Sequence, residues 1–168
     1  MRPRPPRADP PNFGKQVMRR KDKQIDDPAV IESIIRRSLV CRLAMTDGFQ
    51  PYVVPISFGF RDRCLYFHSA GEGRKIELLR KNPRVCFEFD VDLNLKKSDR
   101  PCRWGMKFKS VVGFGTARFI EDPVQKREAL AVILSHYAGE RLEIPDEEIR
   151  RVTVFCVKIE QMTGKQSD

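Results

Sequence analysis

Residues 66–90 read YFHSAGEGRKIELLRKNPRVCFEFD, and this stretch decides the fold. The pattern predicts an apolar strand, a loop of small residues, a helix over residues 72–81 and a second strand. Asn82 and Pro83 mark the end of the helix, because the residue before a proline avoids the helical conformation. The stretch therefore places a loop of small residues directly before the N-terminus of a helix.

That junction has the chemistry of a phosphate-binding site. Three of the five residues in loop 69–73 are glycine or alanine, so the backbone can come close to a ligand. A helix N-terminus presents unpaired N–H groups and the positive end of the helix dipole, and Arg74 and Lys75 add two cations there. His68 and Ser69 contribute an imidazole and a hydroxyl. These residues predict a phosphate cradle; the alternative is an ordinary strand–helix connection with a solvated basic turn.

Length and composition indicate a single globular domain. The chain has 168 residues, of which 40% are hydrophobic and 33% are charged. No apolar run reaches the roughly 18 residues that cross a membrane, and no apolar segment follows the basic N-terminus as it would in a signal peptide. We therefore expect a cytoplasmic protein without membrane segments.

The net charge of +9 is concentrated at the N-terminus. Residues 1–23 hold eight cations and two anions, so they carry +6 of that charge. The rest of the chain is only mildly basic, and we do not expect nucleic-acid binding. Five prolines in residues 1–16 favour extended structure over helix or strand. The chain thus divides into a flexible basic extension, 1–17, and a folded domain, 18–168.

Hydrophobic periodicity predicts six strands and about three helices. The strands are expected at residues 39–46, 52–60, 63–68, 84–93, 106–120 and 153–162. The helices are expected at residues 28–37, 72–81 and 123–138, with a short helical turn at 146–150. The strands follow one another as hairpins without regular β–α–β alternation. This order favours a mainly β (α+β) fold, an antiparallel six-stranded barrel with peripheral helices.

Pro55 restricts the place of its strand in the sheet. Proline cannot donate a hydrogen bond to a strand ladder. The sequence therefore predicts that Pro55 lies at a sheet edge, at a bulge or beside a ligand.

The reactive side chains give little support to other chemistry. There are only two histidines and no zinc-ligand spacing, so no metal site is predicted. The five cysteines include no C-x-x-C pair; Cys102 in a polar loop is the candidate reactive thiol, and four are expected to be buried: Cys41, Cys64, Cys86 and Cys156. His136 on an apolar helix is expected to be structural. No Ser-His-Asp set or phosphate-binding loop of the nucleotidases is present.

One strand carries three alternating carboxylates, Glu88, Asp90 and Asp92. A pair of them would suit acid–base chemistry, but alternation on one face is more typical of a solvated strand surface. We favour the solvated surface.

Several motifs in order resemble the pyridoxamine 5′-phosphate oxidase-like FMN-binding split barrels. They are Phe67-His68-Ser69, Gly73-Arg74-Lys75, Leu79 and Asn82-Pro83, followed by the apolar strand 84–91. Further stretches resemble the 5-nitroimidazole-resistance (Nim-type) branch of that family: MRRKDKQI (18–25), CRLAMTDGFQPYVVPISFGF (41–60), LYFHSAGEGRKIELLRKNPRVCF (65–87), SVVGFGTA (110–117) and KIEQMTGK (158–165). The resemblance covers about residues 18–165.

The resemblance implies a homodimer with FMN at the subunit interface. The residues it implies along the isoalloxazine ring are Val54, Pro55, Ile56 and Ser57. Those it implies at the ribityl phosphate are His68, Ser69, Arg74 and Lys75. Those it implies from the second subunit are Ser110 and Val112.

The activity implied is that of an FMN-dependent oxidoreductase, nitroreductase-like, which takes electrons from a small-molecule donor and passes them to small acceptors such as nitroimidazoles. The alternative is a flavin- or haem-binding module without turnover. No catalytic residue is assigned; His68 is the candidate, with phosphate contact, substrate binding, haem ligation or a purely structural role all open. Trp104 is a candidate for covering the flavin or for the dimer interface. The chain lacks the C-terminal arginine–tryptophan–histidine segment of the true oxidases, so vitamin B6 oxidation is not expected.

Overall fold

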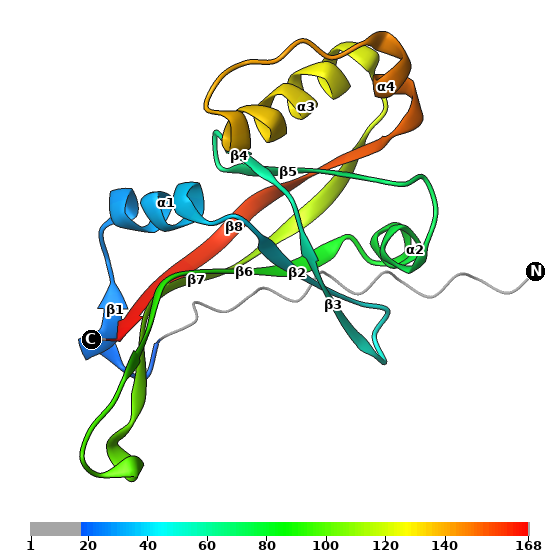
Figure 1. Cartoon of the computed structure of the whole chain (residues 1–168). Coiled ribbons are helices and arrows are strands. Elements are labelled where there is room, and N and C mark those ends of the chain that lie inside the picture. Colours follow the sequence, from blue (N-terminus) through cyan, green and yellow to red (C-terminus); the bar gives the residue numbers. More distant parts are fainter. Residues whose placement is uncertain (1–17, 168) are drawn as a thin grey trace, which may run out of the picture.

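The computed structural model describes residues 18–167, in which eight strands and four α-helices are found (Figure 1). The strands are β1 (Gln24–Ile25), β2 (Cys41–Thr46), β3 (Pro51–Ile56), β4 (Gly59–Arg61), β5 (Cys64–Ser69), β6 (Arg84–Lys96), β7 (Gly105–Ile120) and β8 (Thr153–Ser167). The helices are α1 (Pro28–Arg37), α2 (Arg74–Lys81), α3 (Pro123–Ala138) and α4 (Asp146–Arg151). The predicted extension, residues 1–17, lies outside the described residues.

The strands form one antiparallel sheet in the order β3-β2-β6-β7-β8-β5-β4, with β1 added beside β8. β3 and β4 lie at opposite ends of this order, yet only Ser57 and Phe58 separate them in the chain. The sheet must therefore curl until its two edges meet, without a ladder between them. This is a split barrel, and the predicted mainly β fold is confirmed.

The strand count differs from the prediction for local reasons. The expected strand 52–60 is two strands, because the N–H of Phe58 donates to the Tyr137 hydroxyl at 3.0 Å instead of to a ladder. The two-residue β1 is too short to show a periodicity. β6 and β7 extend beyond the predicted ends into a long hairpin, with a shift in register between Val91 and Asn94. Pro55 lies on the edge strand β3, as its missing donor requires.

Aromatic residues fill the barrel. Phe58, Phe67, Phe87, Phe89 and Phe155 are all fully buried, and the Phe67 and Phe155 rings stack with their centroids 5.1 Å apart. Burial of this apolar area is the main stabilising contribution.

Helix α1 closes one side of this core. Asp27 accepts a hydrogen bond from the Ala29 N–H at 2.8 Å and so caps the helix, with Pro28 in its first turn. Ile34 and Ile35 then pack fully buried in the same cluster as the core of β6 and β7. Helix α3 begins in the same way at Asp122 and packs on β4 and β5.

The other face of the sheet carries a row of small and apolar side chains. In-register pairing places Val53, Ala44, Cys86 and Phe114 side by side across β3, β2, β6 and β7. Their neighbours Leu43, Phe87 and Gly113 face the barrel interior and are buried. Val53 is 61% exposed, so this outer face is open in the isolated chain. Within residues 18–167, no helix is long and apolar enough to span a bilayer.

Candidate functional site

The site predicted from the sequence lies where β5 ends and α2 begins. β5 pairs with β8 as far as Ser69, opposite Thr153. The chain then turns at Gly73, whose φ of 112° suits glycine and strains other residues. Helix α2 starts at Arg74, two residues later than predicted, and no side chain caps it. Its first N–H groups therefore face the loop and are suited to an anion.

Arg74 ties this loop to the edge of the barrel. Its Nη2 donates to the Gln50 Oε1 at 2.9 Å, and its guanidinium lies 5.1 Å from the centroid of the Tyr52 ring. Gln50 precedes β3 and Tyr52 belongs to it. The basic helix start and the strand predicted to follow the flavin ring are thus held next to each other.

His68 and Lys75 form an electrostatic pair inside this site. Partial burial lowers the pKa of the Lys75 ammonium from its ordinary value of 10.5. His68 is exposed, but partial desolvation, and then the nearby charge of Lys75, lower the pKa of its imidazole from the ordinary value of 6.5. A bound anion would favour the charged forms of both groups and so act against these shifts, which makes the two side chains suited to a phosphate.

The four residues predicted along the ring do not share one face. Val54 and Ile56 pack against the core, whereas Pro55 points to the outer face and Ser57 lies exposed beyond the end of β3. What they have in common is the free backbone edge of β3, which pairs with β2 on one side only. A ligand beside β3 would meet this edge more than the four side chains.

Ser110 and Val112 lie away from the cradle. They belong to β7, which β2 and β6 separate from β3. Three strand spacings of about 4.8 Å place them about 14 Å from β3 along the sheet. Both side chains lie half-buried on the outer face, opposite Asp90 and Glu88. A single chain does not bring them together with Arg74 and Lys75.

The carboxylates of β6 form ion pairs with arginines and do not face solvent alone. Arg42 pairs with Glu88 at 3.0 Å and also with Asp90. Partial burial, and then Asp90, raise the pKa of Glu88 from its ordinary value of 4.5. Asp92 pairs separately with Arg37 at 2.9 Å. The sequence did not predict these pairs, because the strand register that places Arg42 opposite Glu88 is a long-range property.

The remaining candidates have structural partners. Trp104 stays 47% exposed on the β6–β7 hairpin and donates from Nε1 to the Ser98 carbonyl at 2.8 Å. His136 contacts the Ser38 carbonyl at 2.8 Å.

The cysteines follow the prediction in part. Cys41 is buried, which raises its thiol pKa, and Cys102 is exposed. The other three are only half-buried: Cys64, Cys86 and Cys156. Among the described residues no cluster of three metal-binding side chains occurs.

Comparison with known proteins agrees with this architecture. The sequence profile of the family described as pyridoxamine 5′-phosphate oxidase matches residues 27–166. No match was found among curated proteins.

Solved structures show similar chains. One, from Bacteroides thetaiotaomicron, is provisionally described as a 5-nitroimidazole antibiotic resistance protein; it is 40% identical, with a TM-score of 0.76 over 85% of this chain and 86% of its own. An FAD-binding protein from Mesorhizobium loti is 27% identical, with a TM-score of 0.64 over 87% of this chain and 98% of its own.

A third structure shares the fold alone. The flavocytochrome from Azotobacter vinelandii is 20% identical, with a TM-score of 0.76 over 90% of this chain and 72% of its own. The family profile spans most of the domain, and the relative at 40% identity covers 85% of the chain. The chain belongs to the pyridoxamine 5′-phosphate oxidase-like family.

Proposed function

We propose that this protein is a homodimeric FMN-binding oxidoreductase that reduces small acceptors. The observation that carries the proposal is the cradle formed by Ser69, Arg74 and Lys75 at the uncapped start of α2, held against β3 by the contact between Arg74 and Gln50. A terminal phosphate has the charge and the acceptor oxygens that such a site binds best.

The flavin proposed is FMN. FMN ends in a phosphate monoester, which can sit directly on the helix N-terminus between two cations. The ring then lies beside the free edge of β3, where unpaired backbone groups can bond to its polar rim. The similar Mesorhizobium loti protein is described as FAD-binding, so FMN and FAD must be compared directly.

Two observations support a dimer with the flavin between subunits. The family resemblance assigns Ser110 and Val112 to the flavin site, but within one chain they lie three strands from β3, so a second copy is the simplest source of these residues at the same cofactor. The outer face also presents the row of Val53, Ala44, Cys86 and Phe114, whose burial would drive association. We place the interface on this face, within the domain 18–168.

The residues present suggest separate roles for the flavin and for the protein. The bound flavin would supply the redox chemistry. Arg74 and Lys75 would neutralise its phosphate, and the β3 edge would fix the plane of the ring. Electrons would come from a nicotinamide or another small donor. The Bacteroides thetaiotaomicron relative is described in terms of resistance to 5-nitroimidazole antibiotics, and this description suggests nitroimidazoles as the acceptor class. The cytoplasm is the compartment proposed.

A second candidate is a haem- or flavin-binding module without turnover. The observation that favours it is His68, an exposed imidazole at the end of β5 whose lowered pKa favours the neutral form that ligates iron. A Soret band in the purified protein would favour this candidate, and a flavin spectrum with donor-dependent bleaching would favour the oxidoreductase.

The phosphate cradle is tested by the double variant Arg74→Ala/Lys75→Ala. Each lost charge-assisted contact costs about 1.5–3 kcal/mol, so FMN should bind at least about 100-fold more weakly. Fluorescence titration of FMN measures this directly. Arg80→Ala, in the last turn of the same helix, is the matched control and should keep the affinity of the parent protein. Equal FMN affinity in the double variant would remove the phosphate assignment.

A further inference from the structure

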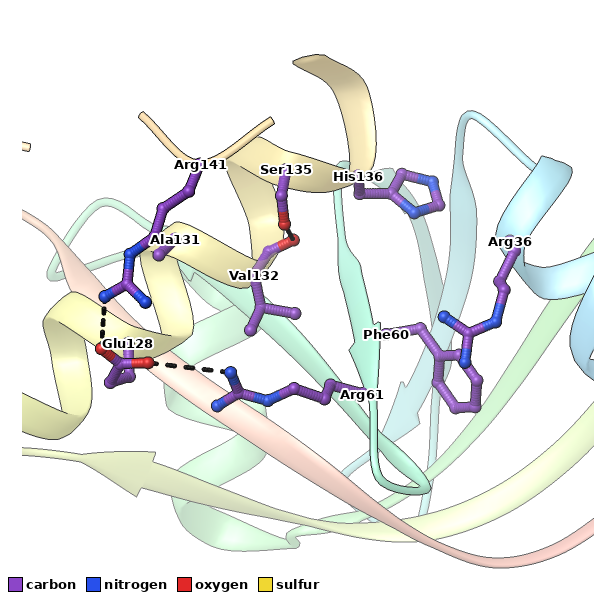
Figure 2. A pocket seen from close by; sticks show the side chains of 9 residues that line it. All are labelled: Arg36, Phe60, Arg61, Glu128, Ala131, Val132, Ser135, His136 and Arg141. Atoms are coloured by element: carbon purple, nitrogen blue, oxygen red, sulfur yellow. Dashed lines mark hydrogen bonds and ion pairs between the residues drawn. The ribbon is translucent and has the colours of Figure 1, made fainter. Parts of the chain in front are cut away.

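A pocket lies at the other end of the barrel from α2, between α1, β4 and α3 (Figure 2). Its volume is about 410 Å³, which falls in the range of small-molecule sites. The residues that line it are Arg36, Phe60, Arg61, Glu128, Ala131, Val132, Ser135, His136 and Arg141. Among them are three arginines and a single carboxylate, so the lining carries an excess of two positive charges.

Glu128 forms a short ion pair with one of the neighbouring arginines and only a long one with another. Its carboxylate bonds Arg141 at 2.6 Å, whereas the Arg61 guanidinium is 3.7 Å away (Figure 2). The other carboxylate near Arg61, that of Asp62, is 3.8 Å away and 89% exposed. Both distances exceed the usual 2.7–3.2 Å of an N–H···O bond. The Arg61 guanidinium also lies 5.9 Å from the centroid of the Tyr66 ring. Since a guanidinium has five N–H donors, Arg61 retains donors for another acceptor.

Arg36 faces the same space from the opposite side. Its guanidinium lies 5.0 Å from the centroid of the buried Phe60 ring, and its contact with Glu32 is long, at 3.4 Å. The aromatic face orients the planar guanidinium without using its N–H groups. Arg36 and Arg61 thus present donors on two sides of the pocket.

The walls of the pocket are held rigidly. A Cβ on Gly59 would lie 2.7 Å from backbone atoms of Val132 and Ile133, so β4 and α3 are in direct backbone contact. The Tyr137 hydroxyl accepts from the Phe58 N–H and donates to the Leu39 carbonyl, at 3.0 and 2.9 Å, which ties α3 to the segment after α1. Because these walls are already ordered, binding a ligand costs little conformational entropy in the protein.

The pocket is remote from the proposed flavin site. Arg61 precedes the Cys64 end of β5, and the phosphate cradle follows its Ser69 end. At about 3.4 Å per residue these two ends are about 17 Å apart. A ligand here would not occupy the flavin phosphate position.

We propose that this pocket is a second binding site, for a small organic dianion whose negative groups are carboxylates or a phosphate monoester. The dianion would bridge Arg36 and Arg61. Its two negative charges would balance the two positive charges that Glu128 does not neutralise. Arginine is the side chain best matched to such groups, because its N–H fork bonds both oxygens of a carboxylate or phosphate.

Calorimetric titration of the purified protein with succinate and, separately, with inorganic phosphate tests this at constant ionic strength. We expect one-site saturable binding of at least one probe, with a dissociation constant of about 1 mM or tighter. Arg36→Gln and Arg61→Gln should each weaken it at least about tenfold. Arg20→Gln is the control, since Arg20 is exposed and, among residues 18–167, forms its ion pair with its neighbour Asp22. FMN affinity should be the same in all three variants.

Inorganic phosphate can also enter the cradle, so the Arg74→Ala/Lys75→Ala protein is titrated in parallel. Binding that persists in this variant and is lost in Arg61→Gln supports the second site. Succinate binding without phosphate binding assigns the site to carboxylates, and the reverse assigns it to phosphate esters. Absence of saturable binding by both probes, or binding unchanged in Arg36→Gln and Arg61→Gln, overturns the proposal.

Discussion

Gly73 shows how one residue couples backbone conformation to the site. Its φ of 112° and ψ of 166° lie in a region that is open almost only to glycine, and this turn aims the first N–H groups of α2 at the loop. Gly73→Ala should lower the free energy of unfolding by about 1–3 kcal/mol and weaken FMN binding as well. Chemical denaturation and FMN titration measure the two effects.

Gly139 provides the control for this prediction. It also has a positive φ, of 74°, and open space around its Cβ position, but it follows α3. Gly139→Ala should lose stability while retaining FMN affinity. If both variants bind FMN as the parent does, the conformation of Gly73 has no part in the site.

The sequence predicted spatial proximity only for residues that lie close together along the chain. Ser69, Arg74 and Lys75 fall within one strand–loop–helix unit, and the structure places them at one junction as expected. The pairing of Arg42 with Glu88 and Asp90 was missed, because it joins residues 46 and 48 positions apart through strand register. Periodicity within a strand shows which residues share a face, but it does not show which strand lies beside it.

At the scale of elements, helices were predicted better than strands. α1 and α3 occupy the predicted residues, because Asp-Pro pairs start both helices with local hydrogen bonds. The strand expected at 52–60 is divided, since Phe58 turns toward Tyr137, 79 residues away. β1 exists only through its pairing with β8 and has no signal of its own.

The packing of β4 on α3 is testable through Gly59. A Cβ there would meet the Val132 and Ile133 backbone at 2.7 Å, and backbone cannot move aside as a side chain can. Gly59→Ala should therefore cost about 1–3 kcal/mol of the free energy of unfolding, measured by urea denaturation. Gly105→Ala, with nothing within 4 Å of its Cβ, should leave stability nearly unchanged. A Gly59→Ala protein as stable as the Gly105→Ala protein would contradict the close contact.

At the scale of the whole molecule, the open outer face should hold two copies together. We expect a mass of twice 19.5 kDa by light scattering after size exclusion. Val53→Glu places a charge on the exposed β3 end of the apolar row and should give a monomer that has lost FMN. Val124→Glu is the control, because Val124 is 70% exposed but lies on α3. A Val53→Glu protein that is still dimeric would place the interface elsewhere.

The split barrel itself was predictable from the whole chain, since hairpin order and the motif 66–90 act together. The proposed cofactor site stays a prediction, because its β7 residues, Ser110 and Val112, would come from a second copy of the chain. In the proposed flavoprotein, the cradle at α2 of one subunit and the β7 residues of the other must meet at one cofactor.

The most direct test is the absorption spectrum of the purified protein, followed by mass spectrometry of the ligand released on denaturation. The account predicts a flavin spectrum, FMN as the released molecule and about one FMN per chain. A colourless protein that also fails to bind added FMN would contradict it, as would a Soret band with no flavin.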